Sequence, residues 1–130
     1  MRSNVCHSRC ACNAQVQRTG GQWQSAEYST FSISDEAGKY RLSVSGYSGD
    51  AGDALAGTDP AERKADGNAF SAPDQDNDLN SQVNRGVVCG CGWWLGDLSH
   101  SRLTDDYDAR WCETYVGIDV AFSRMLVRAN

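Results

Sequence analysis

The sequence has several absences, each of which excludes a class of protein. It has no run of basic residues and a formal net charge of −5, so a nucleic-acid partner is not expected. It has no apolar stretch long enough to span a membrane, yet 40% of its residues are apolar, which is too many for a disordered chain. Its 130 residues fit one domain, or part of one.

Signals for secretion are also missing. Residues 1–13 contain no apolar core of the kind that signal peptides have, and the chain has no Asn-x-Ser/Thr glycosylation site. Six cysteines are nevertheless typical of an oxidising compartment, and the sequence does not choose among their many alternative pairings. We therefore expect an extracellular chain whose N-terminus is missing. The cysteines are Cys6, Cys10, Cys12, Cys89, Cys91 and Cys112.

Catalytic motifs are absent as well. The two histidines, His7 and His100, belong to no nucleophile motif, and there is no phosphate-binding glycine loop. The cysteines around His7 and the pair Cys89 and Cys91 lack the spacing of a standard zinc finger, which favours disulfides or free thiols over zinc. We expect the protein not to be an enzyme.

Alternation of apolar and polar residues predicts antiparallel strands. Residues 31–34 and 40–45 both have this period, and the turn-forming residues 35–38 between them predict a hairpin. A short helix is expected at residues 54–55. Residues 1–15 show no periodicity and are left as an unassigned cysteine-rich leader.

Apolar residues in the second half of the chain indicate further parts of the core. Residues 121–128 are expected to form a closing strand that buries Phe122 and Val127. Two apolar pairs are expected to enter the core as well. They are Val87 with Val88 and Trp93 with Trp94.

The acidic residues Asp74, Asp76 and Asp78 stand at alternate positions just after a proline. Like charges a few Å apart repel by ~1 kcal/mol in water and more near a protein surface. A hard cation such as Ca²⁺ removes that repulsion, whereas the alternative is a solvated acidic loop. The segment is not an EF-hand, because Leu79 and Arg85 occupy the positions of the required glycine and glutamate.

Besides the acidic stretch 74–80, the chain contains the segments Gly21-Gln22-Trp23, Ala26-Glu27-Tyr28-Ser29-Thr30-Phe31, Lys39-Tyr40-Arg41-Leu42, Gly46-Tyr47-Ser48-Gly49, Ala51-Gly52-Asp53, Phe70-Ser71, Gly92-Trp93-Trp94 and Ser123-Arg124-Met125-Leu126-Val127-Arg128. Together these segments resemble the fibrinogen C-terminal domain, which ficolins, tachylectins and other fibrinogen-related lectins share. The order and spacing hold from about residue 16 to residue 103.

The resemblance covers only the later part of the family domain. The N-terminal subdomain has no counterpart, so residues 16–130 are expected to form a partial domain. The implied fold class is α+β: a mixed, mainly antiparallel sheet with short helices and a long-looped calcium-binding region.

The resemblance also implies a set of calcium ligands. These are the side chains of Asp76 and Asp78 and the backbone carbonyls of Asn80 and Gln82, with Asp74 as a nearby charge.

The chain departs from the family pattern at one disulfide. The two cysteines that the family joins in this region align with Arg85 and Leu98, so that bridge is lost. Cys89 and Cys91 lie close to it in sequence and are candidates for a substitute bridge, with Cys112 as a further candidate.

In the lectin members an acetyl group sits beside the calcium ion. The resemblance places the donating amide at Leu98, after a non-proline cis peptide that costs about 3–4 kcal/mol. Ser99 takes the place of a pocket histidine, and Cys89 that of one pocket aromatic. Tyr115 is the surviving aromatic candidate, with an ordinary core tyrosine as its alternative interpretation.

The resemblance therefore implies a secreted, calcium-binding recognition module, a lectin for acetylated carbohydrates in innate immunity. Its partners would be acetylated glycans, and an oligomer is compatible with the pattern. The alternative is a protein-interaction module without a sugar site, as in fibrinogen- or angiopoietin-like relatives. A third interpretation is a truncated domain without independent function.

Overall fold

The computed structural model describes residues 10–57, 64–97, 101–105, 109–111 and 118–129. This part of the chain forms six strands and one short helix, so the mainly antiparallel architecture expected from the sequence is confirmed. The elements are β1 (Cys10–Arg18), β2 (Trp23–Ile33), β3 (Leu42–Gly49), α1 (Arg85–Cys89), β4 (Ser101–Arg102), β5 (Arg110–Trp111) and β6 (Ile118–Ala129).

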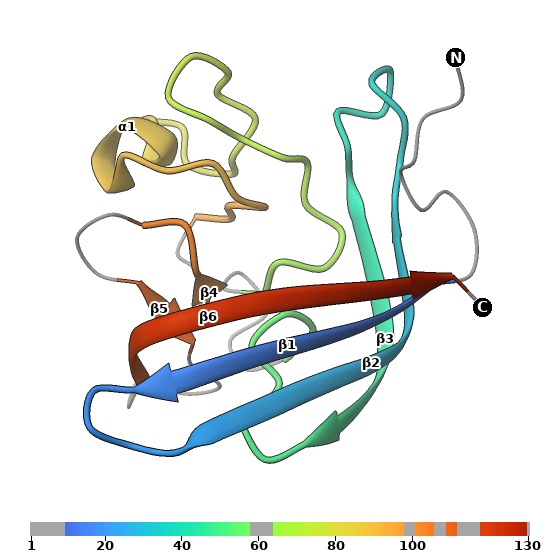
Figure 1. The fold of residues 1–130 in the computed structure, drawn as a ribbon. Helices are drawn as coiled ribbons and strands as arrows, with labels where there is room; N and C mark the ends of the chain where they lie inside the picture. Colours follow the sequence, from blue (N-terminus) through green and yellow to red (C-terminus); the bar gives the residue numbers. More distant parts are fainter. Residues whose placement is uncertain (1–9, 58–63, 98–100, 106–108, 112–117, 130) are drawn as a thin grey trace.

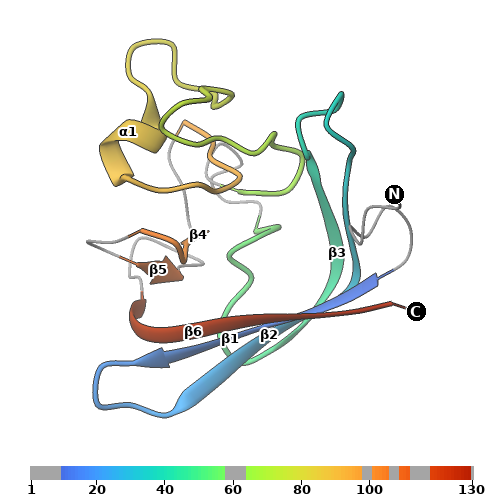
Figure 2. The same ribbon diagram turned by 45° about the horizontal axis from the view of Figure 1, so that its top comes forward.

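The strands form one sheet in the order β3-β2-β1-β6-β5-β4. β6 lies antiparallel to β1, with Cys10 opposite Ala129 and Gln17 opposite Phe122, so the last strand joins the first. The described residues between β3 and β4, 50–57 and 64–97, lie on one side of the strands β1, β2 and β6, as the two views show (Figures 1 and 2). No helix among the described residues is long and apolar enough to cross a membrane.

The core lies between the sheet and these segments. Alternate residues of β1, namely Cys10, Cys12, Ala14 and Val16, are at most 2% exposed. Two tryptophans from the covering segments and Trp111 of β5 pack in the same core, and each indole N–H has an acceptor, as a buried indole requires. Trp93 donates to Ser101 Oγ at 3.0 Å, Trp94 to the Tyr40 carbonyl at 2.9 Å, and Trp111 to the Gly52 carbonyl at 2.8 Å.

The hairpin predicted around residues 35–38 is confirmed, since β2 and β3 pair antiparallel from Ile33 opposite Leu42 to Ala26 opposite Gly49. Tyr40 lies in the turn rather than in the strand, with φ at 54°. The helix expected at residues 54–55 is a buried turn instead. Strand β1 includes residues 10–15, for which the sequence predicts no element. The buried face of β1 consists of cysteine, alanine and a single valine, which give a weak apolar signal.

Some expectations about the core are wrong. Trp93 and Trp94 are buried as predicted, but Val87 and Val88 are 61% and 62% exposed, because α1 turns Gly86 and Cys89 inward. The closing strand exists as β6, yet its Phe122 is 65% exposed and its Val127 is 51% exposed. Among the described residues, β6 has a neighbouring strand on one side only at both positions.

A buried hydroxyl holds the loop after β3 against β2. Tyr28 is 1% exposed, and its hydroxyl donates to Asp53 Oδ1 at 2.8 Å and accepts from the Leu55 N–H at 3.3 Å. The same carboxylate oxygen accepts the Ala56 N–H at 2.9 Å. Burial, and to a lesser degree the Asp53 charge, raise the pKa of Tyr28 above its ordinary value, although the Leu55 hydrogen bond opposes this.

We expect Tyr28→Phe to lower the free energy of unfolding by about 1–3 kcal/mol, because it leaves a half-buried carboxylate oxygen and a buried backbone N–H with one partner fewer. Since the folded state holds the phenolic proton more tightly than the unfolded state, wild-type stability should fall as the pH rises above the ordinary tyrosine pKa of about 10. This alkaline loss should be smaller in Tyr28→Phe. Urea titrations at several pH values measure both effects, with the exposed Tyr40→Phe as control; equal effects of the two substitutions would contradict this role.

Candidate metal centre

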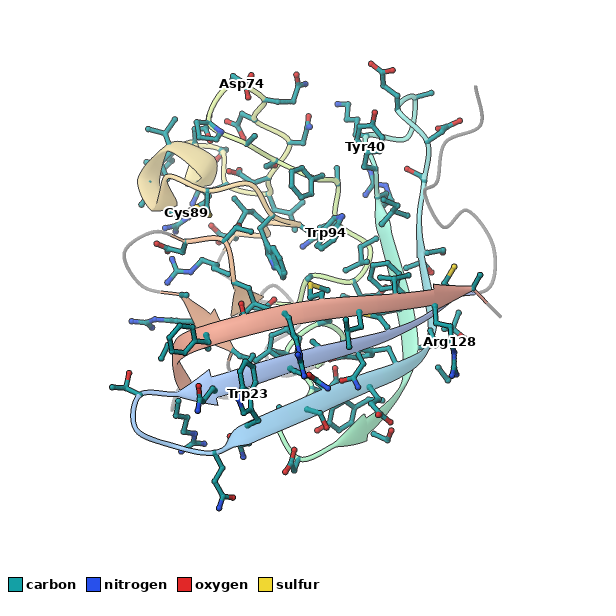
Figure 3. All side chains as sticks on the ribbon, in the orientation of Figure 1. Trp23, Tyr40, Asp74, Cys89, Trp94 and Arg128 are labelled. Carbon is teal, nitrogen blue, oxygen red and sulfur yellow. A yellow bond between two sulfur atoms is a disulfide. The ribbon has the colours of Figure 1, made fainter. Side chains whose placement is uncertain are left out.

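The acidic segment is part of a long loop that leaves the core and returns to it between residues 71 and 93. Ser71 and Trp93 close the base of the loop, with backbone bonds of 2.8 Å and 3.0 Å in the two directions. In Figure 3, Asp74 lies at the outer tip of the loop, whereas Trp94 lies in the interior beneath it. Backbone hydrogen bonds thus fix the base of the loop that carries the acidic residues. Asp74 and Asp76 are exposed, and Asp78 is half-buried.

Asn77 anchors the middle of the acidic segment. Its backbone N–H donates to Ser71 Oγ at 3.0 Å, and its side-chain amide donates to the Phe70 carbonyl at 2.9 Å. Just before Asn77, the backbones of Ala72 and Gln75 exchange two hydrogen bonds of 3.0 Å, which fix the turn between them. Asp76 and Asp78 thus stand on either side of a residue that is fixed to the base of the loop.

The side chains of residues 76, 78 and 80 repeat one local hydrogen bond. Asp76 Oδ1 accepts the Asp78 N–H at 3.3 Å, Asp78 Oδ1 accepts the Asn80 N–H at 2.9 Å, and Asn80 Oδ1 accepts the Gln82 N–H at 2.8 Å. Each oxygen folds back on the backbone two residues further along, which is the Asx-turn geometry of aspartate and asparagine. The four residues expected to bind calcium are therefore linked in one continuous chain of contacts.

The donors present fit a hard cation. Asp78 accepts a second backbone bond, from the Arg85 N–H to Oδ2 at 2.7 Å, but each carboxylate oxygen still has another acceptor site. Calcium takes about 6–8 oxygen ligands, and carboxylates alone cannot supply them here. Within the described part of the chain no group of three or more His, Cys, Asp or Glu side chains is placed to hold a metal. Backbone carbonyls and water are needed to complete the coordination.

Asp97 completes the network, and it was not among the residues predicted from the sequence. Its Oδ1 accepts the Asn80 side-chain amide at 2.6 Å and lies 4.0 Å from Arg85 Nη2. Asp78, Arg85, Asp97 and Asn80 therefore form a closed ring of contacts. This ring joins the loop to the residue just before Leu98, the position where the resemblance implies a lost cysteine, so a polar contact takes the place of the covalent one.

The helix α1, which lies within this loop, ends in a small disulfide ring. Asn84 caps the start of α1 by accepting the Val87 N–H at 3.2 Å, and Gly90 ends the helix at φ 62°, a conformation that favours glycine. Cys89 and Cys91 are bonded to each other, which confirms them as a bridge in this region. Cys10 is also disulfide-bonded, whereas Cys12 is a buried free thiol whose pKa burial raises to about 11.

Three expected ligand-pocket residues, Leu98, Ser99 and Tyr115, lie outside the described residues. The last described residue before Leu98 and Ser99 is Asp97, which contacts Asn80 and Arg85.

We expect Asp97→Ala to lower the free energy of unfolding by about 1 kcal/mol, because it removes one charge-assisted hydrogen bond and a half-exposed ion pair. A double-mutant cycle with Asn80→Ala should give a coupling energy of about 0.5–1 kcal/mol. Denaturant titration measures both values, with Asp74→Ala at the loop tip as the control. Additive effects of the Asn80 and Asp97 substitutions would contradict the contact.

Comparison with known proteins places this geometry in a family. The family model described as "Fibrinogen beta and gamma chains, C-terminal globular domain" matches residues 6–119. Protein scabrous of Drosophila melanogaster is 37% identical over 107 residues, which cover 79% of this chain and 12% of that protein. The human fibrinogen gamma chain is 32% identical over 105 residues, covering 75% of this chain and 23% of that protein.

A techylectin-like protein of Phoneutria nigriventer is 33% identical over 82 residues, covering 63% of this chain and 34% of that protein. Among solved structures, the fibrinogen-like globe domain of human ANGPTL6 superposes with a TM-score of 0.79 at 26% identity, covering 95% of this chain and 58% of that one. The matched part of the chain thus spans 34% or less of the length of these curated relatives. From the family match and the shared fold, the chain belongs to the fibrinogen C-terminal globular domain family.

Proposed function

We propose that the chain is an extracellular recognition module whose binding region is held in place by one calcium ion. The observation that carries the proposal is the repeated turn geometry of Asp76, Asp78 and Asn80 on an anchored loop. The ion would be held by the carboxylates of Asp76 and Asp78 and by the carbonyls of Asn80 and Gln82. When bound, it supplies positive charge that offsets the repulsion between the two carboxylates.

The residues around the ion site would fix the position of the segment that leads to the proposed ligand site. Asn80 holds Asp97 through its side-chain amide, and Arg85 holds the same carboxylate from the helix. A fixed Asp97 limits where the following residues Leu98 and Ser99 can lie. We assign to Leu98 the amide that donates to an acetyl oxygen, and to Ser99 and Tyr115 the lining of the pocket. The proposed activity is binding, not catalysis.

Two observations support an extracellular setting. The bridge between Cys89 and Cys91 and the disulfide-bonded state of Cys10 both require an environment in which thiols are oxidised. The formal net charge of −5 disfavours an anionic partner.

Calcium should raise the melting temperature, because a ligand that binds only the folded state stabilises it by about 2.7 kcal/mol at a concentration of 100 Kd. Affinities of extracellular calcium modules are about 10⁻⁴–10⁻³ M, so the titration must reach the millimolar range. Asp76→Asn should lower the calcium affinity about tenfold, so that the melting shift needs a higher calcium concentration. Asp74→Asn at the loop tip serves as the matched control. A melting curve that does not change between calcium and chelator would remove the calcium assignment.

An acetylated glycan is the ligand class we propose, with support from the techylectin-like relative. The chain should be retained on an acetylated resin in calcium and released both by chelator and by free acetate. Leu98→Pro, which deletes the donating N–H, should lose retention while keeping the calcium-dependent melting shift. Retention that ignores both chelator and acetate would exclude the lectin assignment.

The second candidate is a protein-interaction module without a sugar site. The replacement of the family cysteines by Arg85 and Leu98, and of the pocket histidine by Ser99, favours it. Restoring both cysteines by Arg85→Cys with Leu98→Cys discriminates the two: acetyl binding gained by the double variant supports a lectin scaffold, and no gain supports the protein-interaction module.

A further inference from the structure

The disulfide between Cys89 and Cys91 closes a ring of only three residues. In the chain-entropy account, the stabilisation that a disulfide gives grows with the number of residues it encloses, so this bridge restrains the unfolded chain far less than a long-range bridge does. It also connects no two elements of the fold, because Cys89 is the last residue of α1 and Cys91 lies two residues further on. Stabilising the fold is therefore not what this bridge is suited to.

Backbone hydrogen bonds already fix the same turn. The Cys91 N–H donates to the Gly86 carbonyl at 3.1 Å, and the Gly90 N–H donates to the Val87 carbonyl at 3.3 Å. Together with the left-handed conformation of Gly90, these two bonds form a Schellman motif, which ends a helix without a covalent bridge. The two cysteines are therefore held near each other whether or not their sulfur atoms are bonded. A disulfide on such a turn can open and close again without unfolding the chain.

A small molecule has a route to this disulfide ring from outside α1. Gly90, which separates the two cysteines, is exposed and has no side chain that could shield them. Cys89 is 9% exposed, whereas Cys91 is 3% exposed. In Figure 3, Cys89 lies beside α1, on the opposite side of the molecule from Arg128 in β6. Attack at Cys89 is therefore the more open of the two routes, and it suits a reagent small enough to approach over Gly90.

We propose that Cys89 and Cys91 form a reversible exchange site for a small thiol such as glutathione. The thiolate attacks Cys89 Sγ and forms a mixed disulfide, and the electron pair of the broken bond leaves on Cys91 Sγ, which takes up a proton. A second thiolate attacks the sulfur of the bound small molecule, which releases the disulfide of two small thiols and leaves Cys89 as a thiol. The ring gains two electrons and two protons, and two small thiols are oxidised.

Opening the ring requires space that the neighbouring segments do not provide. Two sulfur atoms that are no longer bonded move apart to van der Waals contact. On one side, Gly86 packs so closely on the base of the acidic loop that a Cβ there would lie 2.7 Å from the Ala72 carbonyl carbon. On the other side, a Cβ at Gly92 would lie 3.0 Å from the Phe70 ring. Because both sides are tightly packed, α1 has to shift outward when the ring opens.

A shift of α1 acts on the acidic loop through Arg85, the first residue of the helix. The Arg85 N–H donates to Asp78 Oδ2 at 2.7 Å, and Arg85 Nη2 lies 4.0 Å from Asp97 Oδ1. When α1 moves, the Asp78 carboxylate loses a donor that fixes its orientation. The loop therefore binds calcium more weakly when the ring is reduced, and this part of the inference rests on the calcium site proposed above.

The exchange is tested on the folded 130-residue chain in buffers of reduced and oxidised glutathione. Trypsin cleaves after Arg85 and Arg102, and the peptide between these sites contains only the two cysteines of the ring. Differential alkylation followed by mass spectrometry of this peptide therefore reports on the ring alone. Excess reduced glutathione should open most of the rings, and oxidised glutathione should close them again. A ring that opens only after denaturant is added would overturn the proposal.

The coupling is tested with melting curves in calcium. The chain with a reduced ring should need about fivefold to tenfold more calcium for the same melting shift than the chain with a closed ring. By reciprocity, saturating calcium should lower the ratio of reduced to oxidised rings by the same factor, and a tenfold factor corresponds to about 30 mV for two electrons. The control is Cys89→Ser with Cys91→Ser, which keeps the other cysteines, and its calcium affinity should not respond to glutathione.

The outcomes separate the two proposals. Equal calcium affinities in the two states of the ring would overturn the coupling, and so would a glutathione effect that persists in the double variant. If calcium shifts neither melting curve while the ring exchanges reversibly, the calcium site fails and the thiol exchange site is supported. If calcium shifts both curves while glutathione leaves the ring closed, the exchange site fails and the calcium site is supported.

Discussion

The pairing of β1 with β6 is the contact on which the rest of the structure depends. It joins Gln15 to Arg124, which are 109 positions apart, so the strands and loops between them form a long loop that this pair closes. Closing so long a loop costs conformational entropy before any contact rewards it. The buried face of β1 offsets that cost, because its side chains belong to the same hydrophobic core as Trp93, Trp94 and Trp111.

The loop with the acidic residues inherits its order from this core. Ser71 and Trp93 close its base over Trp94, and Asn77 fixes its middle, so Asp76 and Asp78 are held by contacts that start at buried residues. A cation site built on such a loop needs little reorganisation to form. The ring through Arg85 and Asp97 extends the same order to the next segment of the chain.

Sequence reasoning was strongest where one local signal was enough. The hairpin between β2 and β3 follows from the alternation of apolar and polar residues and from the turn residues between them. It failed where the outcome depends on distant partners. Asp97 meets Asn80 across 17 residues, and no pattern in the sequence marks that contact.

Phe122 shows the same limit from the other side. Its alternation correctly predicts a strand, but burial depends on whether another element covers that strand, and this is a property of the whole sheet. Strand β1 was missed for the opposite reason, because Cys10, Cys12 and Ala14 are buried without being strongly apolar in pattern. The positions Leu98, Ser99 and Tyr115 lie outside the described residues and remain predictions.

The register of β1 and β6 also determines how the fold responds to a pulling force. Cys10 stands opposite Ala129, so tension applied across these two residues acts at one end of an antiparallel pair. The hydrogen bonds between the strands are then loaded one after another rather than all together. A strand pair loaded in this way separates at low force, and β6 is the first strand that tension would detach from the sheet.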